Sequence, residues 1–136
     1  MNPSSSRFSV FVVDDAPIVC EALRWVIEET PDLELVGEAW EGNQALFEVA
    51  RLSPDVVVID IHLPDLDGYS VARAIKSLNE HPIIVFLSVD SDEDAERRGF
   101  ESGGDAFVAK AQGWDVLLAT IRTALSDYDK KEQLAR

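Results

Sequence analysis

The chain alternates short apolar runs with longer stretches in which apolar and polar residues mix at helical spacing. Five runs have the length and the composition of strands, and they lie at Phe8–Val13, Leu33–Ala39, Val56–Ile59, Ile83–Leu87 and Ala106–Ala109. The run at Val56–Ile59 is the most hydrophobic in the sequence, which is typical of a central parallel strand covered on both faces. The pattern therefore predicts a buried sheet of five strands.

Five helices are predicted between and after these strands, at Pro17–Glu29, Gly42–Leu52, Tyr69–Leu78, Ser91–Glu101 and Asp115–Ser126. In the first helix the expected core-facing stripe consists of Ile18, Leu23, Val26 and Ile27. In the fourth helix Ser91 is the expected N-cap, and the acidic residues that follow it suit the positive end of a helix dipole. Pro54 marks the end of the second helix, and Gly103 and Gly104 mark the end of the fourth.

Strands that alternate with helices build a parallel sheet with helices on both faces. Because crossover connections are right-handed, few strand orders remain, and we expect a doubly wound α/β sheet of order 2-1-3-4-5. Residues 8–127 are expected to form this one domain. Residues 1–7 are expected to form a disordered leader. The charged residues 128–136 are expected to extend the last helix, to fray, or to begin an interdomain linker.

Composition places the chain among ordinary globular domains, because 46% of its residues are hydrophobic and 28% are charged. No apolar run approaches the roughly 20 residues of a membrane span, and Met1–Ser6 lacks the apolar stretch of a signal peptide, so we expect a cytoplasmic protein. The net charge of −14 disfavours binding to nucleic acid. It suits cationic partners or divalent metal ions, and it is equally compatible with a role in solubility alone.

The single cysteine, Cys20, lies in an apolar helical stretch and cannot form an intramolecular disulfide. A catalytic thiol would need a neighbouring histidine, whereas His62 and His81 lie in other segments. We therefore interpret Cys20 as a small buried hydrophobic residue.

Polar residues follow four of the five predicted strands. They are Asp14 and Asp15 after the first strand, Asp60 after the third, Ser88 after the fourth and Lys110 after the fifth. Because parallel strands end at the same edge of a sheet, these side chains are expected to converge in one crevice. Each residue alone is a common turn or surface residue, so their coincidence is the informative feature.

These residue types suit phosphoryl transfer. Clustered carboxylates repel one another unless a cation bridges them, and hard oxygen ligands with open positions suit Mg²⁺. A carboxylate can attack phosphorus to form an acyl phosphate. A lysine, a hydroxyl and a metal ion can then stabilise the charge on the transferred group.

The sequence resembles the receiver domains of two-component response regulators over residues 8–125. The matching motifs are VVDD at 12–15, VVVIDIHLPDLDG at 56–68, the serine that ends IIVFLS at 83–88, and DAFVAK at 105–110. The resemblance implies a flavodoxin-like (βα)5 fold and a phospho-acceptor at Asp60 that takes its phosphoryl group from a histidine kinase. It also implies Mg²⁺ bound by Asp15, Asp60 and the backbone carbonyl of His62, with Asp14 contributing through water.

The same resemblance implies that Ser88 and Lys110 hold the phosphoryl oxygens. It further implies that Ser88 and Phe107 change position when Asp60 is phosphorylated, although a plain core role for Phe107 is an equal alternative. The phosphorylated form would then self-associate as a homodimer or release an output domain. No role is expected for His81.

Two residues depart from the usual receiver pattern. Ala111 follows Lys110, where most receivers have a proline after a cis peptide bond. A cis bond before a non-proline residue costs roughly 2.5–4 kcal/mol. This cost favours a trans bond and an altered switch, but the sequence leaves open whether the bond is cis. Val89 follows Ser88, where a smaller residue is common, so we expect slower phosphorylation than in a typical member.

The stretch LELVGEAWEGNQAL at 33–46 is similar to receivers that precede a LuxR-type helix-turn-helix domain. No such domain is present in these 136 residues. The chain is therefore either a fragment of a transcription regulator or a stand-alone receiver, and the charged tail favours the fragment.

Three other functions are less consistent with the sequence. A phosphatase of the haloacid dehalogenase class needs a second aspartate two residues after the nucleophile, where this chain has His62. A nucleotide-binding protein would need a Walker-type glycine loop, which the sequence lacks. A receiver that works without phosphorylation, as an interaction module, stays open as an alternative. We expect no enzyme in the ordinary sense, because the chain would catalyse only its own phosphorylation and dephosphorylation.

Overall fold

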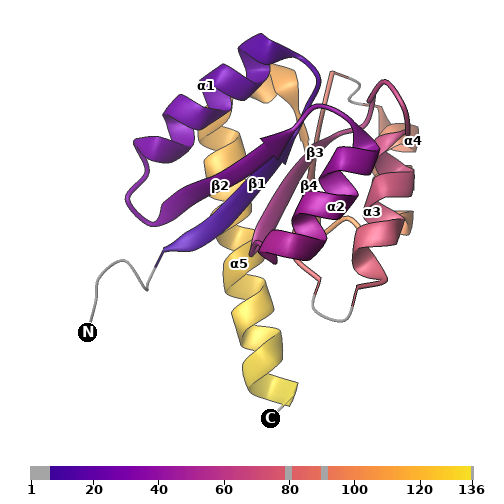
Figure 1. The fold of residues 1–136 in the computed structure, drawn as a ribbon. Coiled ribbons are helices and arrows are strands. Elements are labelled where there is room, and N and C mark those ends of the chain that lie inside the picture. The colour runs from indigo at the N-terminus through magenta and orange to yellow at the C-terminus, as the bar shows by residue number, and fades with distance from the viewer. Residues whose placement is uncertain (1–6, 79–80, 90–91, 136) are drawn as a thin grey trace.

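The computed structural model describes residues 7–78, 81–89 and 92–135, with the backbone alone from residue 130 onward. Five parallel strands form one sheet of order β2-β1-β3-β4-β5, as predicted (Figure 1). The strands are β1 (Phe8–Val13), β2 (Leu33–Ala39), β3 (Val56–Asp60), β4 (Ile83–Ser88) and β5 (Ala106–Ala109).

The helices cover both faces of this sheet (Figure 1). They are α1 (Pro17–Glu28), α2 (Gly42–Leu52), α3 (Gly68–Lys76), α4 (Glu93–Glu101) and α5 (Trp114–Ala135), with a 3₁₀ turn η2 (Lys110–Gln112) before α5. Helices α1 and α5 pack on one face, and α2 and α3 pack on the other. Helix α4 is tied to α3 through a hydrogen bond from Tyr69 Oη to the carbonyl of Ala95.

Each central strand supplies side chains to two separate cores. Val10 and Val12 of β1 join the core under α1 and α5. Phe11 and Val13 of the same strand join the core under α2 and α3. Successive side chains of a strand point to opposite faces, so a continuous apolar run is the pattern that a strand covered on both faces requires.

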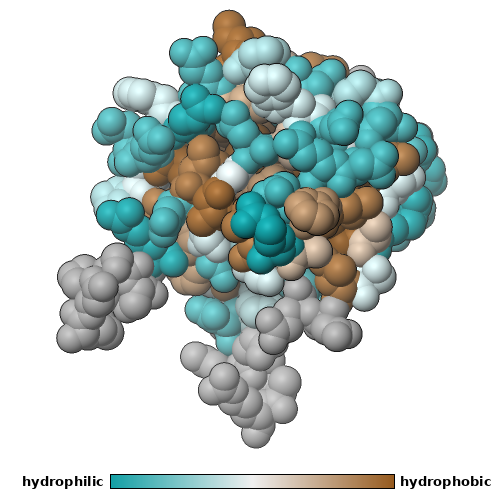
Figure 2. Space-filling view, viewed as in Figure 1, coloured by the Kyte–Doolittle hydropathy of each residue, from teal (hydrophilic) through white to brown (hydrophobic). Residues whose placement is uncertain are grey.

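The predicted apolar stripe of the first helix was wrong at Ile18, whose side chain is 78% exposed. The buried residues of α1 are Cys20, Leu23, Val26 and Ile27. A helix turns by about 100° per residue, so Ile18 lies about 200° around the helix from Cys20 and points away from the sheet. Figure 2 shows other apolar residues that interrupt the polar surface of the viewed face.

The predicted cap of the fourth helix was also displaced by one residue. The N-cap of α4 is Asp92, whose carboxylate accepts a hydrogen bond from the backbone N–H of Ala95 at 2.7 Å. Ser91 lies outside the described residues. A carboxylate at this position satisfies a free N–H and also adds a negative charge at the positive end of the helix.

The structure describes almost all of the C-terminal tail but only one residue of the predicted N-terminal leader. The predicted leader falls almost entirely on residues 1–6, which lie outside the described part of the chain. At the other end α5 continues to Ala135 without a break at residue 127, so the tail extends the last helix. No helix in the described ranges is both long enough and apolar enough to cross a membrane.

Candidate functional site

The carboxyl ends of β1, β3 and β5 bring three charged groups into contact. Asp14 follows β1, Asp60 is the last residue of β3, and Lys110 follows β5. The Nζ of Lys110 lies 3.0 Å from Oδ2 of Asp14 and 3.4 Å from Oδ2 of Asp60. Both aspartates are buried, with residue exposures of 1% and 6%. The predicted convergence is therefore present for Asp14, Asp60 and Lys110.

Asp15 completes an acidic cluster at this edge. One carboxylate oxygen from each of Asp14, Asp15 and Asp60 can be chosen so that all three lie within 4.8 Å of one another. Two oxygens bound to one Mg²⁺ at about 2.1 Å each can be at most about 4.2 Å apart. Small side-chain adjustments would therefore let the cluster hold such an ion, and Asp15 is exposed to solvent, which leaves a path for its entry.

The surroundings of Asp60 disfavour its charged form. Burial raises the pKa of the Asp60 carboxyl, and the nearby charge of Asp14 raises it further. The backbone N–H of His62, 3.2 Å from Oδ1 of Asp60, and the ammonium of Lys110 partly oppose this shift. A second cation would relieve the remaining repulsion between the two carboxylates.

Lys110 balances much of the negative charge in the site. Burial alone would lower the pKa of its ammonium, but the hydrogen bonds and charges of Asp14 and Asp60 outweigh that effect and raise the pKa. The lysine is therefore charged at neutral pH. The Lys110–Ala111 peptide bond, which the sequence left open as cis or trans, is trans, and this segment forms the 3₁₀ turn η2.

The loop after Asp60 passes very close to the site, at a position that sequence reasoning did not single out. The N–H of Gly68 donates to the carbonyl of Ile61 at 2.6 Å. A Cβ atom at Gly68 would overlap the backbone oxygen of Asp60. Only a glycine allows this approach. The sequence feature that could have indicated it is the place of Gly68, eight residues after the aspartate that ends the central strand.

The predicted switch residues lie on β4 and β5. Ser88 is fully buried at the end of β4, and the side chain of Val89 beside it is 69% exposed. Phe107 of β5 is half-buried, with its ring centroid 6.3 Å from that of Phe86. A Cβ atom at Gly99 of α4 would lie 3.1 Å from each of these rings, so the aromatic pair packs directly under α4.

Cys20 has no nucleophilic role in this arrangement. Its Sγ lies 3.1 Å from the backbone carbonyl of Asp14, to which it donates a hydrogen bond. Burial, together with the charges of Glu38 and Asp14, raises the pKa of the thiol to about 11. Since the thiolate is the reactive form, this thiol is inert at neutral pH, in agreement with its interpretation as a small buried residue.

Comparison with known proteins gives the family. The family model described as the response regulator receiver domain matches residues 10–122. A crystal structure of a LuxR-family two-component response regulator from an Aurantimonas species is similar, with a TM-score of 0.85 and 29% sequence identity. That similarity covers 90% of this chain and 87% of the other.

Two curated relatives are longer proteins that match this chain over part of their length. A protein-glutamate methylesterase/protein-glutamine glutaminase of Methanospirillum hungatei is 36% identical over 103 residues, which are 74% of this chain and 29% of the relative. The DNA-binding transcriptional activator EvgA of Escherichia coli is 28% identical over 120 residues, which are 88% of this chain and 58% of the relative. This chain therefore spans less than two thirds of either protein.

The family model covers most of the chain, and the fold and the acidic edge of the sheet agree with it. The chain belongs to the response regulator receiver domain family of two-component signalling systems.

Proposed function

We propose that this chain accepts a phosphoryl group on Asp60 from a histidine kinase, with the help of Mg²⁺, and changes conformation to control an output. The observation that carries the proposal is the contact of one lysine with two buried carboxylates that are 46 residues apart in the sequence. A structural ion pair needs one carboxylate. Two buried carboxylates that repel each other destabilise the free protein, as is common at functional sites.

The transfer follows from the groups present. An oxygen of Asp60 attacks the phosphorus of a phosphohistidine, the new P–O bond forms as the P–N bond breaks, and the imidazole keeps the electron pair and takes up a proton. Lys110 and the hydroxyl of Ser88 stabilise the phosphoryl oxygens. Asp15, Asp60, the carbonyl of His62 and, through water, Asp14 would hold Mg²⁺, which supplies positive charge to the transferred group.

The output is proposed to be transcription, through a DNA-binding domain outside this chain. Support comes from the likeness to EvgA, named as a DNA-binding transcriptional activator, and to a LuxR-family regulator. Ser88 and Phe107 would carry the change from the site to the surface around α4, by self-association or by release of the output domain. The alternative is an interaction module that works without phosphorylation. The methylesterase activity belongs to the named relative.

Intact mass after incubation with acetyl phosphate tests this proposal. We expect one phosphoryl adduct that requires Mg²⁺ and is absent from Asp60→Asn, because the amide is not a nucleophile. A folded wild-type chain that stays unmodified would favour the interaction module. An adduct that persists in Asp60→Asn would place the acceptor at another residue.

A further inference from the structure

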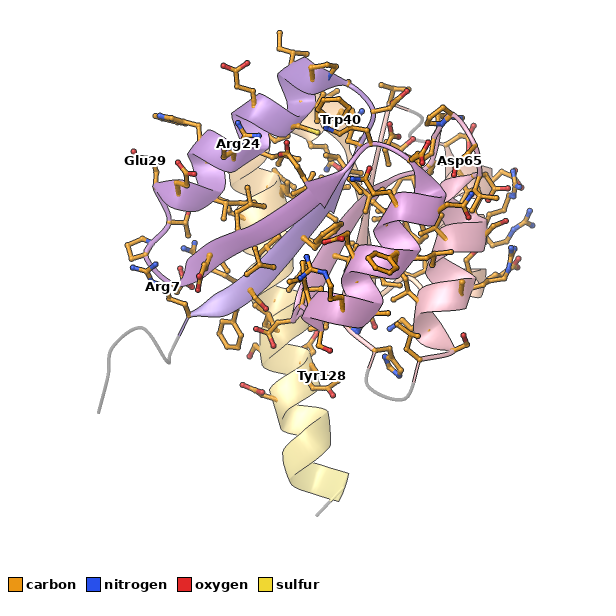
Figure 3. The ribbon with its side chains drawn as sticks, in the orientation of Figure 1. Arg7, Arg24, Glu29, Trp40, Asp65 and Tyr128 are labelled. Atoms are coloured by element: carbon orange, nitrogen blue, oxygen red, sulfur yellow. The ribbon has the colours of Figure 1, made fainter. Side chains whose placement is uncertain are left out.

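Helix α2 is capped by a residue from a distant part of the chain. Its own N-cap, Glu41, makes no side-chain capping hydrogen bond. Instead the carboxylate of Asp65, in the loop between β3 and α3, accepts hydrogen bonds from the N–H groups of Gly42 at 2.7 Å and Asn43 at 2.9 Å. Asp65 is labelled in Figure 3, which has the orientation in which Figure 1 labels α2 and α3.

The packing around these hydrogen bonds is tight. A Cβ atom at Gly42 would lie 2.8 Å from Cγ2 of Val71 and 3.0 Å from Cβ of Leu66. The first turn of α2 therefore rests on the loop next to Asp65 and on α3. We call the two hydrogen bonds together with this packing the Asp65 clamp.

The charge of Asp65 is well suited to its place. The N–H groups of Asn43 and Gly42 lower the pKa of its carboxyl. A negative charge at a helix N-terminus is also favoured by the helix dipole. The carboxylate is therefore ionised at neutral pH, when the hydrogen bonds are strongest.

The clamp holds the middle of a loop whose ends are held elsewhere. At its start the N–H of His62 donates to Oδ1 of Asp60. At its end the N–H of Gly68 donates to the carbonyl of Ile61, and Asp67 caps α3 through the N–H of Ser70. Asp65 lies between these points and joins the loop to a helix from the preceding strand–helix unit.

We propose that Asp65 is a positioning residue for the phospho-acceptor site, because it fixes the backbone at His62–Asp67 by attaching it to α2. This inference rests on the proposed function, in which the carbonyl of His62 binds Mg²⁺. Groups that orient metal ligands typically change metal affinity 10–100-fold when they are removed. A residue that only capped α2 would change the stability of the protein and leave metal affinity unaltered.

The test compares Asp65→Ala and Asp65→Asn with Asp55→Ala as a matched control. Asp55 also joins two distant segments through its carboxylate, which accepts hydrogen bonds from the backbone N–H of Ser9 at 2.7 Å and from its hydroxyl at 3.1 Å. It does so at the amino ends of the strands, far from the acidic cluster. Two quantities are measured on the full chain: the Mg²⁺ dissociation constant by calorimetry, and amide hydrogen exchange at residues 61–67.

We expect Asp65→Ala to weaken Mg²⁺ binding by about tenfold and to raise exchange in the loop. Asp65→Asn keeps one acceptor oxygen and is expected to show a smaller loss. Asp55→Ala is expected to alter neither quantity. Wild-type Mg²⁺ affinity in Asp65→Ala would overturn the inference and leave the proposed function intact.

A wild-type chain that binds no Mg²⁺ would overturn the proposed function. In that case the hydrogen-exchange measurement still tests the Asp65 clamp, because unchanged exchange at residues 61–67 in Asp65→Ala would show that Asp65 does not fix the loop.

Discussion

Asp60 is held in an environment that opposes its own charge. It is buried beside Asp14, and both carboxylates contact the ammonium of Lys110. The raised pKa of Asp60 means that the folded state binds a proton more tightly than the unfolded state. This destabilises the folded protein at neutral pH, and the penalty disappears as the pH falls through the pKa of the folded state.

Asp60→Asn is therefore expected to stabilise the metal-free protein at pH 7, by an amount on the order of 1 kcal/mol, the usual size for a single substitution. The gain over wild type should shrink as the pH falls through the raised pKa of Asp60, because the wild-type carboxyl then becomes neutral, like the amide. Urea unfolding at several pH values measures this. Glu21→Gln removes the same charge from the exposed side of α1 and should show no comparable gain. A lower free energy of unfolding in Asp60→Asn than in wild type at pH 7 would contradict the conclusion that the Asp60 charge destabilises the folded protein.

Val89 is the residue whose size is expected to limit the rate of phosphorylation. It is exposed and follows the buried Ser88 in the chain, and we expect it to restrict the access of a phosphoryl donor. Val89→Ala is expected to speed acetyl phosphate labelling by a few-fold, with no change in the final amount of adduct. Labelling at the wild-type rate would remove the support for this explanation.

At the scale of elements, the loop between β3 and α3 packs closely against the backbone of Asp60. The loop returns so closely on β3 that the first residue of α3 must be Gly68. This contact joins the backbone of the central strand to the beginning of a helix. A side chain at position 68 would therefore clash with the backbone of Asp60.

Gly68→Ala is expected to lower the free energy of unfolding by about 1–3 kcal/mol, the range for overpacking, and to weaken Mg²⁺ binding. The reason is that the new methyl group overlaps the backbone oxygen of Asp60. Urea unfolding and calorimetry measure the two effects. Ser70→Ala, two residues later in the same helix, should show neither effect on the same scale. Wild-type Mg²⁺ affinity in Gly68→Ala would contradict the expectation that the backbone of this loop influences the acidic cluster.

At the scale of the whole molecule, the net charge of −14 makes the protein sensitive to cations in general. A divalent ion can act by screening the surface or by binding at the acidic edge of the sheet. Screening depends on ionic strength, whereas binding at the edge depends on particular carboxylates. The two effects can therefore be separated.

Mg²⁺ at ten times its dissociation constant should stabilise the wild-type protein by about 1.4 kcal/mol, a rise in Tm of about 5 °C for a domain of this size. NaCl at the same ionic strength should give a smaller rise. In Asp15→Asn, Mg²⁺ and NaCl should raise the Tm by the same amount, since this substitution removes one carboxylate of the cluster. Equal effects of both salts on wild type would show that only screening operates.

Local patterns were enough to predict the elements and the sheet. Buried parallel strands require apolar residues at successive positions, and their ends are marked by polar residues, so both the strands and the acidic cluster could be predicted. The pattern alone did not predict correctly which residues of a helix face the sheet. Ile18 has the right residue type for a core position, but only the packing of α1 on the sheet shows that it points away from the core.

By itself, the sequence determined the strand order and the residues at the strand ends, because local propensities and chain connectivity decide these features. The tertiary structure alone decided which carboxylates Lys110 contacts, why Gly68 has no side chain, and that Asp65 caps α2. Each of these depends on distances between segments that lie far apart in the chain or on a close backbone approach. Residue type and spacing carry no information about such distances until the sheet brings the segments together.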